Sequence, residues 1–241
     1  MAHVVEVFSS IQGEGLYVGT RQVFVRFAGC NLACTYCDTP DSRQLCQFAL
    51  VERTAGKRNF ISVSNPLSLE NLVQVINSLL TFRHHSISFT GGEPLCQAAS
   101  IIKLAPQLNA PIYLETNGTL PDRLAEVLPY VDIISMDIKL PSIAGKSYWQ
   151  EHYEFLRLAL DKEVFVKVVV TGQTKETEIK QAVNLVASVS SEIPLILQPV
   201  TPINGCEPVT PETLLMYQEH ALAILKNVRV IPQTHKFMGQ L

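Results

Sequence analysis

Three cysteines lie within eight residues of one another, and Cys30, Cys34 and Cys37 form the pattern C-x3-C-x2-C. The residues between and after them are polar and typical of a loop, so three thiolates could converge on one metal centre. A structural zinc ion takes four ligands, and here only Asp38 or Cys46 could complete the set. The alternative is a four-iron cluster held by three thiolates, which leaves one iron free to bind another group.

A second pattern lies at the end of an apolar run, where the sequence is Thr90-Gly91-Gly92-Glu93-Pro94. Glycines allow a backbone to approach a ligand closely, and the carboxylate of Glu93 could accept hydrogen bonds from an ammonium group. Taken alone, such a stretch is more often a strand-to-helix turn. Its occurrence in the same chain as the cysteine loop would otherwise require two unrelated coincidences.

The elements that must position these residues are strands and helices in alternation. Apolar runs rich in β-branched residues predict buried strands, and Ser68, Thr174 and Thr210 are expected at the starts of amphipathic helices. This alternation predicts an α/β fold with a mostly parallel sheet. The expected strands are residues 4–8, 22–27, 86–90, 111–115, 133–137, 164–170 and 195–198.

Polar residues follow several of these expected strands. In barrels of parallel strands, active sites gather at the carboxyl ends of the strands. We therefore expect these residues together to surround one opening, although each on its own is more often ordinary turn chemistry. They are Glu115, Ser135, Met136, Asp137, Gln198 and Pro199.

The polar segment 41–66 interrupts the alternation and carries mixed charges. A loop of that length within a domain is unusual and is often functional, but a solvated excursion is an equal alternative. We expect a variable insertion within a single domain that spans residues 1–241.

The composition excludes several classes of protein. Hydrophobic residues make up 47% of the 241 residues and charged residues 17%, below the usual charged share of about 25%, which argues against disorder. A net charge of −3 predicts no direct binding to nucleic acid. Without a signal peptide or an 18-residue apolar run, we expect a cytoplasmic protein that has no membrane partner and keeps its six cysteines free of disulfides.

The cysteine pattern, with Tyr36 before its last cysteine, and the Gly-Gly-Glu-Pro stretch together resemble the radical S-adenosylmethionine (SAM) enzymes. The resemblance implies a partial (β/α)6 open barrel, which fits a chain that is short for a complete barrel of about 250 residues. It also implies a [4Fe-4S] cluster on Cys30, Cys34 and Cys37, with SAM bound to the open iron. The SAM-binding residues that it implies are Tyr36, Gly92, Glu93, Ser135, Met136, Asp137, Gln198 and Pro199.

Three further segments resemble the 7-carboxy-7-deazaguanine synthase family, namely Gln12-Gly-Glu-Gly15, Asp38-Thr39 and Gln233-Thr-His-Lys236. This resemblance implies a lyase that converts 6-carboxy-5,6,7,8-tetrahydropterin to 7-carboxy-7-deazaguanine and ammonia, a step towards queuosine and other 7-deazapurines. A 5′-deoxyadenosyl radical would take hydrogen from the pterin, the ring would contract, and SAM would be regenerated. The implied partners are the pterin, an electron donor such as flavodoxin or ferredoxin, and a second copy in a homodimer.

The same resemblance assigns Thr39 to Mg²⁺ and a further set of residues to the substrate. Arg26 offers a planar fork that suits a carboxylate, although a structural ion pair is an alternative for it. The family often ends in proline with its carboxylate at the substrate, whereas Leu241 stands here. The implied substrate residues are Ile11, Gln12, Gly13, Glu14, Arg26, Thr90, Glu115, His235 and Leu241.

Two other functions compete with this one. A glycyl-radical-enzyme activase would share the cysteine pattern and act on a partner protein. A zinc-stapled binding module would bind without catalysis and would hold zinc in place of iron.

Overall fold

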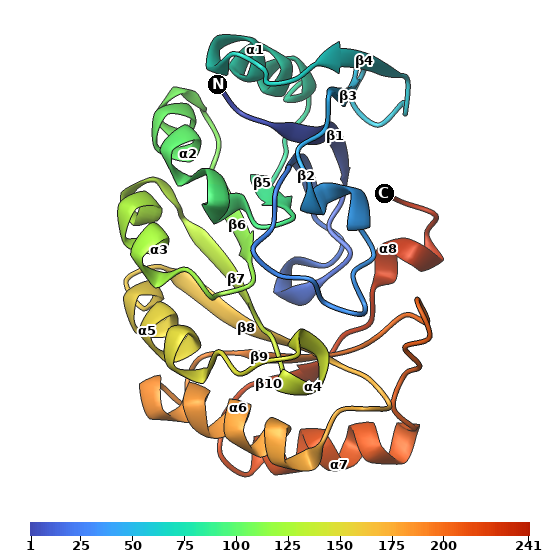
Figure 1. Ribbon diagram of the computed structural model, residues 1–241, viewed down its shortest axis with the longest axis vertical. Coiled ribbons are helices and arrows are strands. Elements are labelled where there is room, and N and C mark those ends of the chain that lie inside the picture. Colours follow the sequence, from blue (N-terminus) through green and yellow to red (C-terminus); the bar gives the residue numbers. More distant parts are fainter.

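The computed structural model describes residues 1–241 and contains one ten-stranded sheet, ordered β10-β9-β8-β7-β6-β5-β2-β1-β3-β4. From β2 to β10 every neighbouring pair is parallel, and each strand from β2 to β9 in this part is followed by a helix (Figure 1). The expected α/β fold with six strand–helix units in an open sheet is thus confirmed. These strands are β2 (Arg21–Phe27), β5 (Ser86–Gly91), β6 (Ile112–Thr116), β7 (Ile133–Ile138), β8 (Glu163–Val170), β9 (Leu195–Pro199) and the unpredicted β10 (Val228–Val230).

The longer helices lie along one side of the sheet, from α1 at the top of Figure 1 through the left side to α7 at the bottom. Ser68 and Thr210 cap their helices as expected, because their hydroxyls accept the N–H groups of Asn71 and Thr213. Thr174 does not cap α6; its hydroxyl accepts the Thr171 N–H instead, and the helix begins at Glu176. The helices are α1 (Leu69–Leu79), α2 (Ala98–Leu104), α3 (Pro121–Val127), α4 (Pro141–Ala144), α5 (Trp149–Ala159), α6 (Glu176–Val189), α7 (Pro211–Leu222) and α8 (Thr234–Phe237).

The polar segment 41–66 is not a loop, which corrects the sequence-based expectation. Within it β3 (Phe48–Glu52) and β4 (Phe60–Ser64) form an antiparallel hairpin. The hairpin extends the sheet because β3 pairs in parallel with β1 (Val4–Ile11), which in turn is antiparallel to β2. Five-residue strands whose partner is some forty residues away leave little periodic signal in a sequence. The 3-10 helices are η1 (Gly15–Tyr17), η2 (Pro40–Arg43), η3 (Pro94–Gln97), η4 (Ala105–Gln107) and η5 (Leu128–Tyr130).

The main core lies between the sheet and the helices, where 46 buried apolar residues form one cluster. All six residues of β7 are buried, because helices cover one face of this strand and the other face lines the interior of the open barrel. No helix in the structure has the length and apolarity needed to cross a membrane.

Candidate active site

One cavity of about 220 Å³ lies at the carboxyl ends of the parallel strands. Its wall is built from β1 and β2, the loop that follows β2, the ends of β5 to β9, and the C-terminal segment 233–241. The segments that carry the predicted site residues therefore meet at one place, as barrels of parallel strands lead us to expect.

The loop that carries the three cysteines forms one side of this cavity, and Cys30, Cys34 and Cys37 all line it. Backbone hydrogen bonds close the base of the loop, since Cys30 N–H donates to the Arg43 carbonyl at 3.2 Å. The Arg43 guanidinium also donates to the Cys34 carbonyl at 2.5 Å. Burial raises the pKa of the Cys30 and Cys34 thiols, so without a metal both are neutral at pH 7.

The donor set fits an iron–sulfur cluster with one open position better than it fits zinc. Cys46 lies outside the cavity wall, and its thiol bonds to Asn65 and the Val4 carbonyl. Asp38, the other candidate for a fourth zinc ligand, bonds to Gln233 at 3.0 Å and Lys236 at 3.4 Å. No three His, Cys, Asp or Glu side chains are gathered tightly enough to hold a single ion. Three separated thiols facing one cavity suit a cube whose irons take one thiolate each.

Gly91, the last residue of β5, and Gly92 bring this strand against the cysteine loop. The Gly92 N–H donates to the Phe27 carbonyl, and a Cβ built on Gly92 would lie 2.3 Å from the Gly29 carbonyl oxygen and 2.6 Å from that of Ser42. Only glycine permits this approach. Gly92 and Thr90 both line the cavity, as the sequence predicted for a ligand site.

Glu93 takes a different position from the one predicted. Its side chain is fully buried and lies outside the cavity wall. The carboxylate accepts hydrogen bonds from the Thr116 hydroxyl and from the N–H groups of Asn117 and Leu95. Burial raises its pKa to about 7, although these three donors act in the opposite direction. The carboxylate therefore ties the ends of β5 and β6 together and does not face an ammonium group in the cavity.

The other predicted SAM residues divide according to the two-residue period of a strand. Tyr36, Ser135, Asp137 and Gln198 line the cavity. Met136 does not, because alternate side chains of β7 point to opposite faces and the Met136 side chain lies in the helix-side core. Pro199 lies outside the wall for the same reason, as the neighbour of Gln198 on β9.

Two lysines of a buried charge network in the cavity wall, Lys139 and Lys167, were missing from the sequence-based site. The Lys139 ammonium donates to Asp137 at 3.0 Å and to the Tyr36 hydroxyl at 2.9 Å. The Lys167 ammonium lies 3.3 Å from the same Asp137 carboxylate and also pairs with Glu14. Burial alone would lower the pKa of Lys167, but the two carboxylates hold it well above its usual value. A single lysine in the otherwise apolar 164–170 run was the readable signal for Lys167.

The lysine also fixes the charge of Glu14. Burial by itself would raise the pKa of this carboxyl, but Lys167 lowers it to about 2. Gln233 donates a further hydrogen bond to Glu14 at 2.7 Å. The second oxygen of Asp137 is buried without a hydrogen-bond partner. The network thus presents an unused acceptor beside two ammonium groups.

Gln12, which follows β1, Thr90 of β5 and Glu115 of β6 are predicted substrate residues that form a polar floor. The Gln12 amide donates to Glu115 at 2.7 Å, and the Thr90 hydroxyl donates to the other Glu115 oxygen at 2.9 Å. Arg26 lines the cavity and also forms an ion pair with Glu6 at 2.7 Å. The structural ion pair is therefore present, and the binding of a substrate carboxylate by Arg26 stays a prediction.

The remaining predicted residues also lie at the cavity. They are Ile11, Gly13, Glu14, Thr39, His235 and Leu241. His235 packs directly on Gly13, since a Cβ there would lie 2.1 Å from its Nδ1. The Thr39 hydroxyl bonds only to Ser42, at 3.3 Å. Of the sequence-predicted site residues, only Glu93, Met136 and Pro199 lie outside the wall.

Comparisons with known proteins agree with this geometry. The radical SAM superfamily model matches residues 24–186. The 7-carboxy-7-deazaguanine synthase of Geobacter sulfurreducens is 45% identical, with 100% of this chain and 98% of the relative aligned. The synthase of Archaeoglobus fulgidus is 35% identical over 99% of this chain and 98% of its own length.

Two solved structures share the fold. QueE from Escherichia coli superposes with a TM-score of 0.62 at 21% identity, covering 97% of this chain and 94% of that one. A radical SAM methyltransferase from Sphaerobacter thermophilus gives 0.61 at 13% identity, over 95% of this chain and 77% of that one. The family implies a [4Fe-4S] cluster and SAM, and three thiols on one cavity-lining loop are suited to hold such a cluster. The chain is a radical SAM enzyme that belongs to the 7-carboxy-7-deazaguanine synthase family.

Proposed function

We propose that the cavity converts 6-carboxy-5,6,7,8-tetrahydropterin to 7-carboxy-7-deazaguanine and ammonia. The observation that carries this proposal is the meeting of the three-thiol loop with the Gln12–Glu115 floor in one cavity. The proposal is also supported by relatives named 7-carboxy-7-deazaguanine synthase, which align over the full chain.

Cys30, Cys34 and Cys37 would hold the cluster, and Tyr36, Gly92, Ser135, Asp137 and Gln198 would surround SAM. When bound, the cluster and SAM together supply a 5′-deoxyadenosyl radical that can take hydrogen from the substrate. Lys139 holds Tyr36 and Asp137 in place through two hydrogen bonds, which fixes the position of the loop relative to β7.

The substrate would lie on the floor formed by Gln12, Thr90 and Glu115. Glu115 is a carboxylate acceptor suited to the guanidine-like nitrogens of a pterin, and Gln12 offers an amide beside it. Arg26 would bind the substrate carboxylate with the part of its guanidinium that Glu6 leaves free. Ile11, Gly13, Glu14, His235 and Leu241 would complete the enclosure.

An anaerobic assay tests the proposal. Reconstituted protein is incubated with SAM, reductant, Mg²⁺ and 6-carboxytetrahydropterin, and mass spectrometry follows the deazaguanine acid. We expect product from the wild type, none from Cys34→Ala, and normal product from Cys96→Ala, which removes an exposed thiol outside the cavity wall. SAM cleavage on a glycyl-radical partner without deazaguanine, or about one zinc and no iron per chain, would contradict the proposal.

Thr39 would bind Mg²⁺ through its hydroxyl, supported by its place in the cavity wall beside the last cluster cysteine. In Thr39→Ala the Mg²⁺ concentration needed for half-maximal rate should rise while the SAM requirement stays constant. Thr39→Ser keeps a hydroxyl and should restore the wild-type titration curve. Identical curves for all three proteins would reject this role.

We also propose that residues 1–241 form one domain, that it works as a homodimer, and that a flavodoxin or ferredoxin reduces the cluster. The unbroken ten-stranded sheet supports the first statement. The exposed side chains of Phe48 and Leu50 on β3 support the homodimer. Light scattering of the purified protein would test it by measuring the mass in solution.

A further inference from the structure

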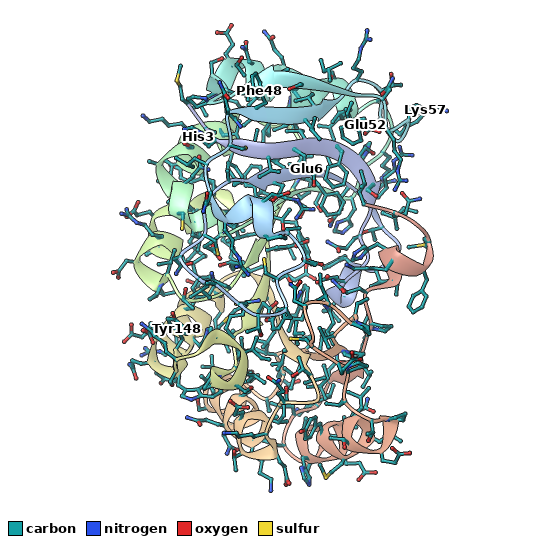
Figure 2. The ribbon with its side chains drawn as sticks, turned by 45° about the vertical axis from the view of Figure 1, so that its right-hand side comes forward. His3, Glu6, Phe48, Glu52, Lys57 and Tyr148 are labelled. Carbon is teal, nitrogen blue, oxygen red and sulfur yellow. The ribbon has the colours of Figure 1, made fainter.

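The hairpin of β3 and β4 reaches the C-terminal segment 234–241 at the edge of the cavity. The Arg58 guanidinium, in the turn of the hairpin, donates to the Gly239 carbonyl at 2.5 Å. Figure 2 labels Glu52 and Lys57 at the end of the hairpin that lies nearest this segment. The proposed function uses the hairpin only for the exposed Phe48 and Leu50 of a dimer contact, and it gives the turn that carries Arg58 no task.

Buried groups hold Arg58 in the conformation that makes this contact. Its backbone lies in the left-handed region with φ 56°, which is sparsely populated by residues other than glycine. The Arg58 N–H donates to one oxygen of Glu52 at 2.7 Å, and the Ser9 N–H donates to the other at 2.9 Å. Because Glu52 is only 1% exposed, this carboxylate connects the hairpin turn firmly to β1.

The segment that Arg58 contacts folds back over the cavity. The Gln240 N–H donates to the His235 carbonyl at 2.9 Å, and the Ser10 hydroxyl bonds to the Gln240 side chain at 3.3 Å. His235 and Leu241, on either side of Gly239, both line the cavity. A contact at Gly239 therefore restrains two wall residues at once.

We propose that Arg58 is a positioning residue, which holds the segment 234–241 against the cavity so that His235 and Leu241 stay in its wall. The hairpin thereby serves the substrate site without touching the substrate. Glu52 acts through Arg58, because it fixes the unusual backbone of the turn. This role for Arg58 rests on the proposed function only in taking the carboxypterin as the molecule that the cavity encloses.

Hydrogen exchange of the reconstituted protein tests the contact directly. In Arg58→Ala the amides of residues 234–240 should exchange about threefold to tenfold faster, the range expected when one exposed hydrogen bond of ordinary net strength is lost. Arg53→Ala is the matched control, because Arg53 is an exposed arginine of the same hairpin. Equal exchange of this segment in both variants would overturn the proposal. Faster exchange throughout the sheet would also overturn it, since that would show general unfolding.

Kinetics test what the contact does for the substrate. In Arg58→Ala the KM for the carboxypterin should rise about threefold to tenfold while kcat stays near that of Arg53→Ala, and Arg58→Lys should recover part of the loss. If the amides of residues 234–240 exchange faster in Arg58→Ala but the KM is unchanged, the positioning role is refuted. If the wild type makes no deazaguanine, the proposed function fails, whereas the exchange experiment still decides whether Arg58 holds the segment.

Discussion

Glu93 illustrates how a residue in a functional motif can serve the structure around the site. Its buried carboxylate accepts three hydrogen bonds. One oxygen accepts from the Leu95 N–H and the Thr116 hydroxyl, and the other accepts from the Asn117 N–H. Thr116 is the last residue of β6 and Asn117 follows it, whereas Glu93 follows the end of β5. The residue therefore fixes the distance between two strand ends that both border the cavity.

Replacing this carboxylate by an amide should cost stability. In Glu93→Gln an NH2 group must face one of the donors, so we expect the free energy of unfolding to fall by about 1–3 kcal/mol. Urea denaturation of the anaerobic protein measures it. Glu126→Gln is the control, because Glu126 is exposed and pairs only with Arg123, and it should change stability by less than about 1 kcal/mol. Equal losses would disprove the role of Glu93.

At the scale of the element, the end of β5 and the cysteine loop are packed so closely that a side chain between them has no room. Gly92 meets two backbone carbonyl oxygens, those of Gly29 and Ser42, and neither can move aside as a flexible side chain could. The loop that holds the three thiols is therefore shaped by its packing against the end of β5.

Adding one methyl group at Gly92 should displace the loop. In Gly92→Ala we expect the iron content after reconstitution to fall at least about twofold, because the three thiols lose their relative positions. Iron analysis and the visible absorption of the cluster measure this. Gly172→Ala is the control, since its new Cβ would make only ordinary contacts at 3.5 Å and 3.6 Å. Full iron loading in Gly92→Ala would contradict the packing argument.

At the scale of the whole molecule, one histidine joins three elements. His152 of α5 is fully buried, its Nδ1 lies 3.1 Å from the Gly118 carbonyl after β6, and its Nε2 accepts the Lys139 N–H after β7. A neutral ring with its proton on Nδ1 satisfies both contacts. Burial lowers the pKa of His152 to about 4, so the folded protein keeps the ring neutral.

This pKa shift predicts how stability depends on pH. Between pH 6.5 and 4 the unfolded chain binds a proton at His152 that the folded protein does not bind. The contribution is complete above pH 6.5 and is lost as the pH falls, by up to about 1.4 kcal/mol per pH unit. Urea denaturation at pH 7, 6 and 5 should show a shallower pH slope for His152→Gln than for wild type or for His220→Gln. The same slope in all three proteins would contradict it.

Local patterns predicted more of this molecule than distant pairings did. The cysteine loop and the apolar strands follow from spacing within a few residues, and so does the alternation that places Ser135 and Asp137 in the cavity. If this alternation had been applied strictly, Met136 and Pro199 would not have been predicted to line the cavity. The pairing of β3 with β1, the burial of Glu93 and the Arg58 contact depend on residues far apart in the chain, which no local pattern encodes.

The contact between Gly13 and the C-terminal segment has a consequence for how the protein folds. The Thr234 N–H donates to the Gly13 carbonyl at 2.9 Å, so this wall of the cavity joins residues 221 positions apart. Contacts between residues so far apart in the chain form slowly, because the entropic cost of bringing them together precedes any gain from the contact. We expect this wall to form after the sheet has assembled. Until it does, we expect the cavity that the three thiols line to stay open on this side.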